Sequence, residues 1–599
     1  MKFLPRALDE SKLMILRTYY DSGTNDFKTP DDVLDIVYKD IDTGKIYIET
    51  LNNPKIEIYV VKPQYRTFDY YKNFIKKEEC DKYLVPYKFR YAEIGKILGC
   101  SPKDAKFSKY VYQIDMDIEH FYIMQFFKEY GCKTDNKPLT LGFSDIESDI
   151  IQIEDGFPTP GETPTNAISY FDEGKDVMYT LVCVQDNVPH VPETSKKYEF
   201  YEKLRERFKK QTDDFIARID EFKEECRKDF EETYGKIDYK IMVFEDEVSM
   251  YKAYWKIIEY CQNDYAFFWN APYDISNLIE RPRFLGIDPS EIICSPDFGP
   301  RKVKWHEDKN AQVHKRKHIF DTYTKTTFMD QMVNYAGIRS GKGKLPSVKL
   351  NAIAKNELKD EKLDYSEYGN IKMFPYYDWW KFIKYNIKDV LLQVGIERKT
   401  HDANYIYLVM TTSSLKPSEV FTSTTVVGND LRLFADMESG MVMGSNKNKL
   451  FKVPKTEEQI KEEKKDKFAG AFVMNPGHCS STGYVLLGAL NKYIHDHAID
   501  FDITSEYPTG MLIMNSSNET MVGKVYLEDP DNIEIKLYEN MYIIDGDDQV
   551  IYNKTADKSN LMVEGLSENN PTAFGETFFH LPSFTQIATH IEDNIEDFI

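Results

Sequence analysis

The 599-residue chain lacks the cysteine patterns and long apolar runs that mark zinc-binding, secreted or membrane proteins. Its eight cysteines include no C-x-x-C pair and no zinc-type spacing, which favours a reducing compartment. No apolar run approaches the roughly 18 residues that cross a bilayer, and the opening MKFLPRALDE has no apolar signal-peptide core. P-loop, G-x-S-x-G and glycine-rich dinucleotide motifs are also missing. We therefore expect a cytoplasmic protein with no membrane partner.

Positive charge is scarce as well. The chain has 77 Lys and Arg residues against 99 Asp and Glu residues, a formal net charge of −22. This balance argues against a general nucleic-acid coat protein, but an acidic chain can still act on nucleic acid if its basic residues line one groove. The length predicts roughly four domains or lobes of about 150 residues each. A hydrophobic fraction of 42% is enough for their cores.

The sequence pattern changes along the chain. Residues 1–139 mix β-rich stretches with aromatic helical ones, which predicts an α+β lobe. Across residues 140–400 candidate strands alternate with helical segments, as in an α/β domain. The charge-dense run at 453–467 indicates a linker or solvated helix, and we expect a further domain at 461–599. The expected fold class is therefore multidomain, α/β and α+β.

A stripe of apolar residues lies in a charged segment of the α/β region. Leu204, Phe208, Phe215, Phe222 and Phe230 follow helical spacing. This predicts an amphipathic helix or helix pair packed on the domain, with a coiled-coil partner site as the alternative.

The stretch LGFSDIESDI, residues 141–150, places two carboxylates on alternate positions of a candidate strand. Residues two apart on a strand face the same side, so Asp145 and Glu147 are expected to point together. Acids on the covered face of a strand are costly unless they are paired or bind cations. The pattern predicts a metal, a basic partner or a surface cleft, although a strand end in solvent would give the same pattern.

Two later segments carry further acids. In FFWNAPYDISNLIERP an aromatic strand runs into a helical pattern at Asp274, whose carboxylate is either a helix N-cap or a site residue at a strand-to-helix crossover. In FIKYNIKDVLLQVGIE, Tyr385 and Asp389 are four residues apart and share one helix face. The alternative for this third segment is an amphipathic helix with a solvent-facing Asp.

These four acids, with no Cys or His cluster beside them, suit hard divalent cations such as Mg²⁺ or Mn²⁺. Two such ions about 4 Å apart can activate a water and stabilise the leaving oxygen of a phosphodiester. Tyr385 would then orient the attacking water or contact the scissile phosphate.

The three segments resemble, in chain order, the Exo I (DxE), Exo II (Nx₂₋₃[FY]D) and Exo III (YxxxD) motifs of DEDDy 3′–5′ exonucleases. More narrowly, they resemble the proofreading domain of family B DNA polymerases of the T4-like phage type. Residues 344–365, KLPSVKLNAIAKNELKDEKLDY, are similar to the stretch between Exo II and Exo III in those enzymes. The resemblance implies an RNase H-like domain at 140–400 that holds two metal ions at the four acids. It also implies that residues of about 401–460 complete the N-terminal lobe. If the chain is viral, the resemblance implies that it acts in the cytoplasm of the host cell.

A second acidic motif, AIDFDITSEYPTGM, resembles motif A of the same polymerases, usually Dx₂SLYPS. The resemblance implies that Asp502 and the Ile503 carbonyl bind the metals of nucleotide addition. It implies too that amides near Ser505 and Glu506 hold the triphosphate of a dNTP substrate, and that Tyr507 stacks under its sugar. Glu506 stands where leucine is usual, and its carboxylate would repel a triphosphate unless it were turned away.

Motif B (KxxxNSxYG) and motif C (YxDTDS) of that family are missing, and the acidic IIDGDDQV at 543–550 fits a hairpin turn better. The chain thus resembles the N-terminal part of a polymerase. It is either a subunit whose second chain would carry the fingers, the rest of the palm and the thumb, or a fragment of a longer chain that carries them. Its partners would be primer–template DNA, single-stranded DNA, that second subunit and a sliding clamp. Two alternatives stay open: a stand-alone DEDDy exonuclease with a structural palm remnant, and a non-catalytic replisome scaffold.

One basic stretch stands out in this acidic chain, RKVKWHEDKNAQVHKRKH at residues 301–318. It fits a solvated loop or hairpin. It would equally fit a guide for a single strand through phosphate contacts.

Overall fold

The fold is known from a computed structural model that describes most of the first 444 residues. The described residues are 13–23, 32–66, 74–130, 139–153, 156, 158–299, 301–340 and 345–444, together with strands between 521 and 580. The chain divides into two compact units, Met1–Phe451 and Lys452–Ile599. Helices and a mixed sheet occur together in the first unit, so the expected α/β multidomain class is confirmed.

The N-terminal lobe is built on antiparallel sheets, one of order β1-β2-β3 and one of order β6-β4-β7. The expected aromatic helix is α3, and its Phe121 and Phe126 are 0 and 1% exposed. Burying an aromatic side chain of this size stabilises a fold by about 1.5–3 kcal/mol. The elements of this lobe are β1 (Leu13–Asp21), β2 (Val33–Asp40), β3 (Ile46–Asn52), β4 (Lys55–Val61), β5 (Phe74–Lys76), β6 (Cys80–Pro86), β7 (Val111–Tyr112), α1 (Arg90–Leu98), α2 (Pro102–Phe107) and α3 (Ile118–Tyr130).

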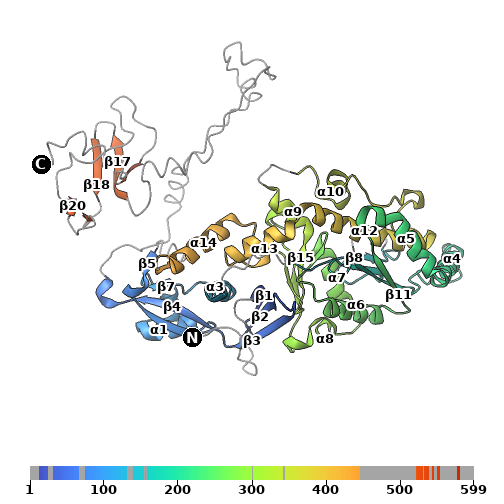
Figure 1. Cartoon of the computed structure of the whole chain (residues 1–599), viewed down its shortest axis with the longest axis horizontal. Helices are drawn as coiled ribbons and strands as arrows, with labels where there is room; N and C mark the ends of the chain where they lie inside the picture. Colours follow the sequence, from blue (N-terminus) through green and yellow to red (C-terminus); the bar gives the residue numbers. More distant parts are fainter. Residues whose placement is uncertain are drawn as a thin grey trace, which may run out of the picture. The chain divides into compact units, whose positions relative to one another are not determined.

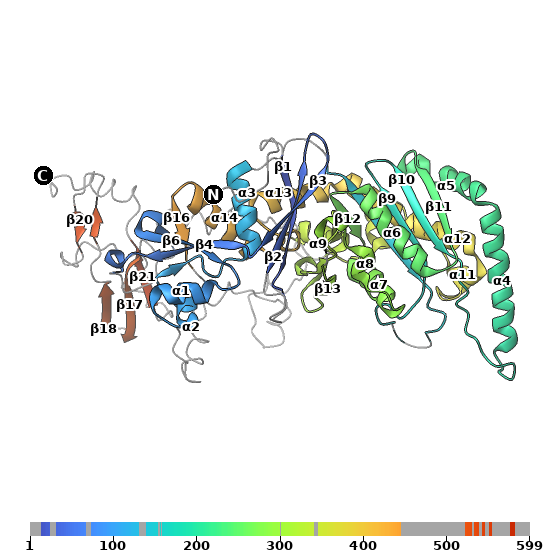
Figure 2. The ribbon, with the colours of Figure 1, turned by 90° about the horizontal axis from the view of Figure 1, so that it is seen from below.

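A six-stranded mixed sheet forms the centre of the next region, in the order β11-β10-β9-β8-β12-β15. β8 pairs antiparallel with β9 and parallel with β12, so it is a central strand with neighbours of both directions. Figure 2 shows β9, β10 and β11 side by side in this sheet. The strands are β8 (Leu141–Ser148), β9 (Thr165–Asp172), β10 (Val177–Cys183), β11 (Asp238–Phe244), β12 (Tyr265–Phe268) and β15 (Thr327–Asp330).

Helices cover both faces of this sheet (Figure 1). On one face, Phe143 of β8 packs in a core with residues of α4, α5 and α12. On the other, Ile146 of β8 packs with residues of α6 and α7. The helices of this region are α4 (Tyr198–Ala217), α5 (Ile219–Tyr234), α6 (Glu247–Cys261), α7 (Ala271–Phe284), α8 (Pro289–Ile293), α9 (Gln331–Ile338), α10 (Leu350–Glu357), α11 (Phe374–Tyr377) and α12 (Trp379–Thr400).

The apolar stripe of the charged segment forms the helix pair α4 and α5. Phe208, Phe215, Phe222 and Phe230 are all buried in the core that α12 shares. The prediction of helices packed on the domain is therefore confirmed.

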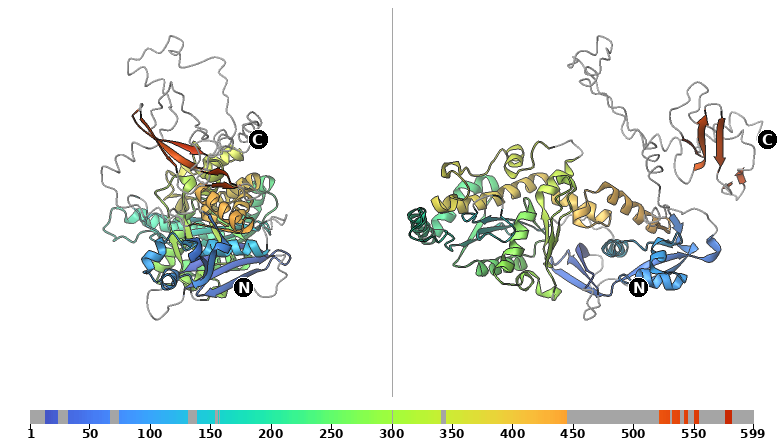
Figure 3. Two further views of the ribbon diagram at one scale, coloured as in Figure 1. Left: turned by 90° about the vertical axis from the view of Figure 1, so that its left-hand side faces the viewer. Right: turned by 180° about the vertical axis from the view of Figure 1, so that it is seen from behind.

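After α12 the chain continues through α13 (Asp402–Thr412) and α14 (Ser423–Met437), which follow α12 in Figure 3. The short strand β16 (Met441–Met443) then pairs antiparallel with β5, so residues 441–443 lie in a sheet with residues 74–76.

The basic stretch at 301–318 forms part of a hairpin. β13 (Lys304–His306) pairs antiparallel with β14 (Ile319–Asp321), as the hairpin interpretation predicts. Arg301 makes two hydrogen bonds to buried Asp35 of β2, at 2.8 and 2.9 Å. Arg301 of the basic stretch therefore joins the 140–400 domain to the N-terminal lobe through an ion pair with a buried carboxylate. Removing one partner of such a pair is strongly destabilising.

The second unit is described as strands only. Its elements are β17 (Met521–Asp529), β18 (Asn532–Leu537), β19 (Tyr542–Ile544), β20 (Val550–Asn553) and β21 (Glu576–His580). β18, β17 and β21 form one sheet in that order. β19 and β20 pair antiparallel, which agrees with the hairpin predicted around 543–550.

None of the helices in the described part of the chain is both long enough and apolar enough to cross a membrane.

Glu397, near the end of α12, gives a prediction about stability. Its side chain is 3% exposed and accepts the Ala403 N–H at 2.8 Å, and burial raises the pKa of its carboxyl from 4.5 to about 8. Between these values the folded chain holds a proton that the unfolded chain has lost, so stability falls as pH rises from about 5 to 8. Glu397→Gln keeps an acceptor oxygen and removes the charge. We expect its melting temperature to fall less than that of the wild type over this range.

The matched control is Glu438→Gln, which changes an exposed residue just after α14. Thermal melts at intervals between pH 5 and 8 should show the wild-type pH dependence for this control. A wild-type pH dependence for Glu397→Gln as well would contradict the account of Glu397.

Candidate metal centre

β8 carries two acids beyond the point where its neighbour β12 ends. The pairing of β12 with β8 stops at Phe143, and the two strands are parallel. Asp145 and Glu147 therefore lie past the carboxyl end of β12, where open α/β sheets place their sites. Both are half-buried, and they share with Phe143 the face of the sheet that α12 covers. The predicted strand and the common direction of its two acids are thus observed.

Asp274 comes from the helix that follows β12. Asn270 turns the chain with a φ of 68° and is the N-cap of α7, so Asp274 in the first turn of that helix is not the cap. The Asp274 side chain is 3% exposed, and its Oδ1 accepts the N–H of Ile146 at 3.4 Å. Because Ile146 lies between Asp145 and Glu147, this bond places the Asp274 carboxylate against the two acids of β8.

Tyr385 and Asp389 lie one turn apart on α12, as their spacing predicts. Asp389 is 2% exposed, which excludes the solvent-facing alternative for it. Between them in sequence, Asn386 donates from Nδ2 to Asp145 Oδ2 at 2.9 Å. This hydrogen bond joins the face of α12 directly to the acids of β8.

Three of the predicted acids converge. One carboxylate oxygen from each of Asp145, Glu147 and Asp389 lies within 4.8 Å of the others, and the group could hold a metal ion. Asp274 adjoins this three-acid group without belonging to it. Carboxylate oxygens are the ligands that hard divalent cations prefer.

Burial raises the pKa of every acid of this site, and repulsion from a neighbouring acid adds to it for Asp145, Glu147 and Asp274. Burial, then the negative charge of Asp389, raises the pKa of Asp145. Burial, then Asp145, raises the pKa values of Glu147 and Asp274 well above their ordinary range. The ionised forms are therefore unfavourable unless a cation sits among them.

Lys362 supplies one such cation. Its Nζ forms an ion pair with Asp389 Oδ2 and lies 3.2 Å from the Tyr385 hydroxyl. Burial alone would lower the pKa of Lys362, but the negative charges of Asp389 and Asp145 hold it above its ordinary value. Asp389 Oδ1 is buried and, within the described chain, has no hydrogen-bond partner. The residues present thus fit a metal ion, because an acceptor oxygen is left for it.

Lys362 and Asn386 contact the acids of the candidate site, and the sequence motifs did not single them out. Lys362 lies in the segment 344–365 that carries the resemblance between Exo II and Exo III. Asn386 directly follows Tyr385, but nothing in the sequence indicated that its side chain would contact Asp145.

Buried hydrogen bonds fix the elements around the site. Asp149, just after β8, is 1% exposed and its Oδ2 accepts from Tyr376, Asn166 and Asn187 at 2.6 to 3.2 Å. Asp330 at the end of β15 accepts the N–H of Asn270 at 3.3 Å as well as two N–H groups of α9. The start of α7 and the exit of β8 are therefore held by side chains that are themselves buried.

The second motif lies outside the described residues. Its residues are Asp502, Ile503, Ser505, Glu506 and Tyr507. Their roles stay predictions.

A scan against protein-family models gave no match for this chain, and a search of curated proteins gave none either.

The three-acid group gives a prediction that needs no nucleic acid. Asp145→Asn removes one negative charge at nearly constant side-chain volume and so relieves repulsion among the acids. Without divalent cations we therefore expect a higher melting temperature than in the wild type, by about 2–4 °C for each kcal/mol of repulsion that is relieved. Mn²⁺ or Mg²⁺ should raise the melting temperature of the wild type by binding the folded state. The same ions should stabilise Asp145→Asn much less.

Asp238→Asn, on the exposed start of the edge strand β11, is the control and should behave as the wild type in both conditions. An unchanged metal response in Asp145→Asn would show that the three acids do not form a cation site.

Proposed function

We propose that the chain is the N-terminal part or subunit of a family B DNA polymerase acting in DNA replication, and that its 140–400 domain is a 3′–5′ proofreading exonuclease. The observation that carries this proposal is the convergence of Asp145, Glu147 and Asp389, with Asp274 against them. These acids are far apart in sequence and belong to the three segments that resemble Exo I, II and III. A mixed sheet with helices on both faces is also the architecture expected of an RNase H-like domain.

Mg²⁺ or Mn²⁺ at these acids would supply an activated water and would stabilise the leaving oxygen. Asp145, Glu147 and Asp389 would hold such an ion, and Asp274 would add a ligand to a second one. In the reaction the water oxygen bonds to the 3′-terminal phosphorus. The bond from phosphorus to the 3′ oxygen of the preceding nucleotide breaks, and that oxygen ends protonated.

Tyr385 acts in this proposal as a hydrogen-bond donor. Burial, then the negative charges of Asp389 and Glu147, raises the pKa of its phenol, so the hydroxyl keeps its proton at neutral pH. A protonated phenol beside the three-acid group can donate to the attacking water or to the scissile phosphate. Its ring stays in place through packing against Tyr365 and Phe374, with centroid distances of 5.7 and 5.9 Å.

Lys362 adds a positive charge next to the reacting phosphate. Its ammonium lies between Asp389 and Tyr385, so it can neutralise the acid when no ion is bound and stabilise charge on the phosphate during hydrolysis. We assign it a role in positioning the phosphate, together with the phenol of Tyr385.

The polymerase half of the proposal rests on the motif A resemblance at Asp502. Motif C, which this chain lacks, would come from a second chain. Asp502 and the acids of that motif C would together hold the metals of nucleotide addition. Primer–template DNA, dNTPs, that second chain and a sliding clamp would be the partners.

The exonuclease proposal is tested with a 3′-labelled single strand or a 3′ mismatch and Mg²⁺. Asp145→Ala should lower the rate by about 10²–10³-fold or more, the range seen when an electrostatic stabiliser of a transition state is lost. Tyr385→Phe should lower kcat by about tenfold while the apparent affinity for Mn²⁺ stays unchanged, because the phenol is not a metal ligand.

Asp238→Ala is the control on the exposed edge of the same sheet. Nucleotide release that survives Asp145→Ala would refute the assignment. No release from the wild type with either ion would favour the scaffold alternative.

The polymerase half has its own test, primer extension with and without a chain that carries motifs B and C. We expect synthesis only with both chains, and loss of synthesis but not of 3′ hydrolysis in Asp502→Ala. Normal synthesis by this chain alone would contradict the split arrangement. Normal synthesis by Asp502→Ala with its partner would favour the stand-alone exonuclease.

A further inference from the structure

α12 carries a row of buried polar side chains on the face that packs against β8. Asn386, Asp389 and Gln393 are three and four residues apart, which is the spacing of one helix face. They are 0, 2 and 0% exposed. A polar group at this depth destabilises the fold unless it is hydrogen-bonded, so the partners of these side chains matter.

Two amides of this row donate to neighbouring residues of β8. Gln393 Nε2 donates to the carbonyl oxygen of Ser144 at 3.2 Å, and Asn386 Nδ2 donates to Asp145 Oδ2 at 2.9 Å. In both amides the oxygen is buried and, within the described chain, has no hydrogen-bond partner. The two amides are therefore alike in burial and in what they leave unpaired. They differ in that only one of them holds an acid of the candidate metal centre.

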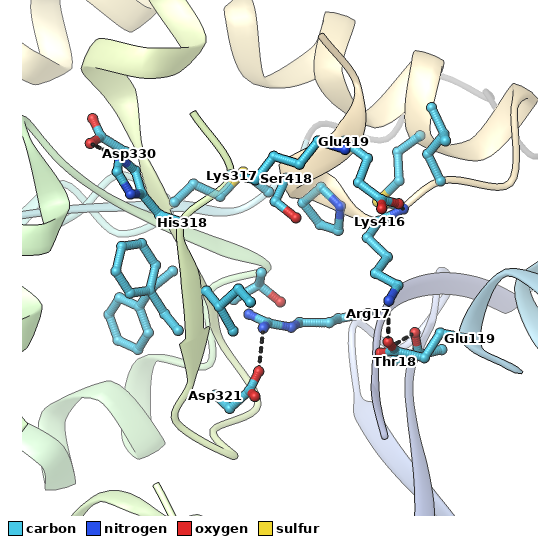
Figure 4. Close-up of a pocket in the computed structure, with 18 of the residues that line it drawn as sticks. Arg17, Thr18, Glu119, Lys317, His318, Asp321, Asp330, Lys416, Ser418 and Glu419 are labelled. Carbon is cyan, nitrogen blue, oxygen red and sulfur yellow. Dashed lines mark hydrogen bonds and ion pairs between the residues drawn. The ribbon is translucent and has the colours of Figure 1, made fainter. Parts of the chain in front are cut away.

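Other hydrogen bonds around the metal centre act on the main chain. Asp274 accepts the N–H of Ile146, and Asp330 accepts the N–H of Asn270. Figure 4 shows Asp330 beside His318 in the wall of a cavity that the acids of the metal centre do not line. Together with the bond from Gln393, these contacts determine where β8, α7 and α12 lie. They do not determine how the carboxylate of a metal ligand is turned.

The Asp145 carboxylate depends on Asn386 for its orientation. In the part of the chain that the structure describes, the amide of Asn386 makes the only hydrogen bond to this carboxylate. The negative charge of Asp389 acts on the same group and would turn it away. A donor held on Oδ2 opposes that rotation and leaves Oδ1 without a hydrogen bond. Because the amide is uncharged, it does so without adding a positive charge that would repel a cation.

We propose that Asn386 is a positioning residue of the metal centre. By holding Oδ2 of Asp145, it keeps this carboxylate turned toward Glu147 and Asp389, with the other oxygen available to a divalent cation. Asn386 acts through Asp145 and touches neither the ion nor the phosphate. The role rests on the proposed function, since that function requires a metal ion at these acids. Loss of a side chain that orients a metal ligand typically lowers metal affinity about 10–100-fold.

The test is a Mn²⁺ titration of the full chain without nucleic acid, with the free ion measured by electron paramagnetic resonance. Asn386→Leu is close to asparagine in size and removes both the donor and the unpaired amide oxygen. Its melting temperature without ions should stay within a few degrees of the wild type, because two buried polar atoms leave together. Its Kd for Mn²⁺ should rise about 10–100-fold. Asn386→Ala, which cannot overpack the site, should show the same loss of affinity.

Gln393→Leu is the matched control. It makes the same kind of change on the same face of α12, and the bond that it removes goes to the Ser144 carbonyl. We expect its Kd for Mn²⁺ to stay within about twofold of the wild type. In the 3′ hydrolysis assay, Asn386→Leu should need a higher Mn²⁺ concentration for half-maximal rate and should recover most of kcat at saturation. Gln393→Leu should leave that concentration unchanged.

Three results would overturn the positioning role. Both Asn386 variants could bind Mn²⁺ as tightly as the wild type while Asp145→Asn loses binding, in which case the metal centre stands without this role. Gln393→Leu could lose as much affinity as Asn386→Leu, which would show that the packing of α12 on β8 decides the affinity. Absence of Mn²⁺ binding in the wild type would overturn the metal centre itself, and the proposed function with it.

Discussion

Electrostatic repulsion among closely spaced carboxylates, two half-buried and one buried, is the constraint on which this site depends. Asp145, Glu147 and Asp389 bring their oxygens within 4.8 Å of one another in a place where burial already disfavours the ionised form. Such a group is costly to a fold unless a cation compensates it. Lys362 compensates part of the charge through Asp389. The other oxygen of Asp389 has no hydrogen-bond partner among the described residues, and a metal ion bound there would relieve the rest of the repulsion.

The fold forces this arrangement in small steps. β12 ends early, so β8 extends past it and carries Asp145 and Glu147 into the space where α7 begins. α12 covers the same face of the sheet and presents Asp389 there. Buried Asp149 and Asp330 fix the ends of β8 and α7 through hydrogen bonds to other elements, so the positions of the acids do not depend on the acids alone.

Local periodicity was enough to predict the parts of the site that lie within single elements. The two-residue spacing of Asp145 and Glu147 and the four-residue spacing of Tyr385 and Asp389 each define one face of one element. The apolar stripe of α4 and α5 was predictable for the same reason. Asp274 could not be distinguished from a helix cap, because that depends on Asn270 taking a φ of 68° and the N-cap position. Lys362 reaches Asp389 across 27 residues of chain, and no periodicity connects them. The contact between the two lobes could not be predicted for the same reason, since Arg301 and Asp35 are 266 residues apart in sequence.

The most direct measurement is a crystal structure of the chain soaked in Mn²⁺, with the ions located by anomalous scattering. We expect a peak bound by oxygens of Asp145, Glu147 and Asp389, at the roughly 2.0–2.6 Å typical of hard divalent cations, and a displaced Lys362 ammonium. An ion-free site at saturating Mn²⁺, with Lys362 still paired to Asp389, would contradict the account.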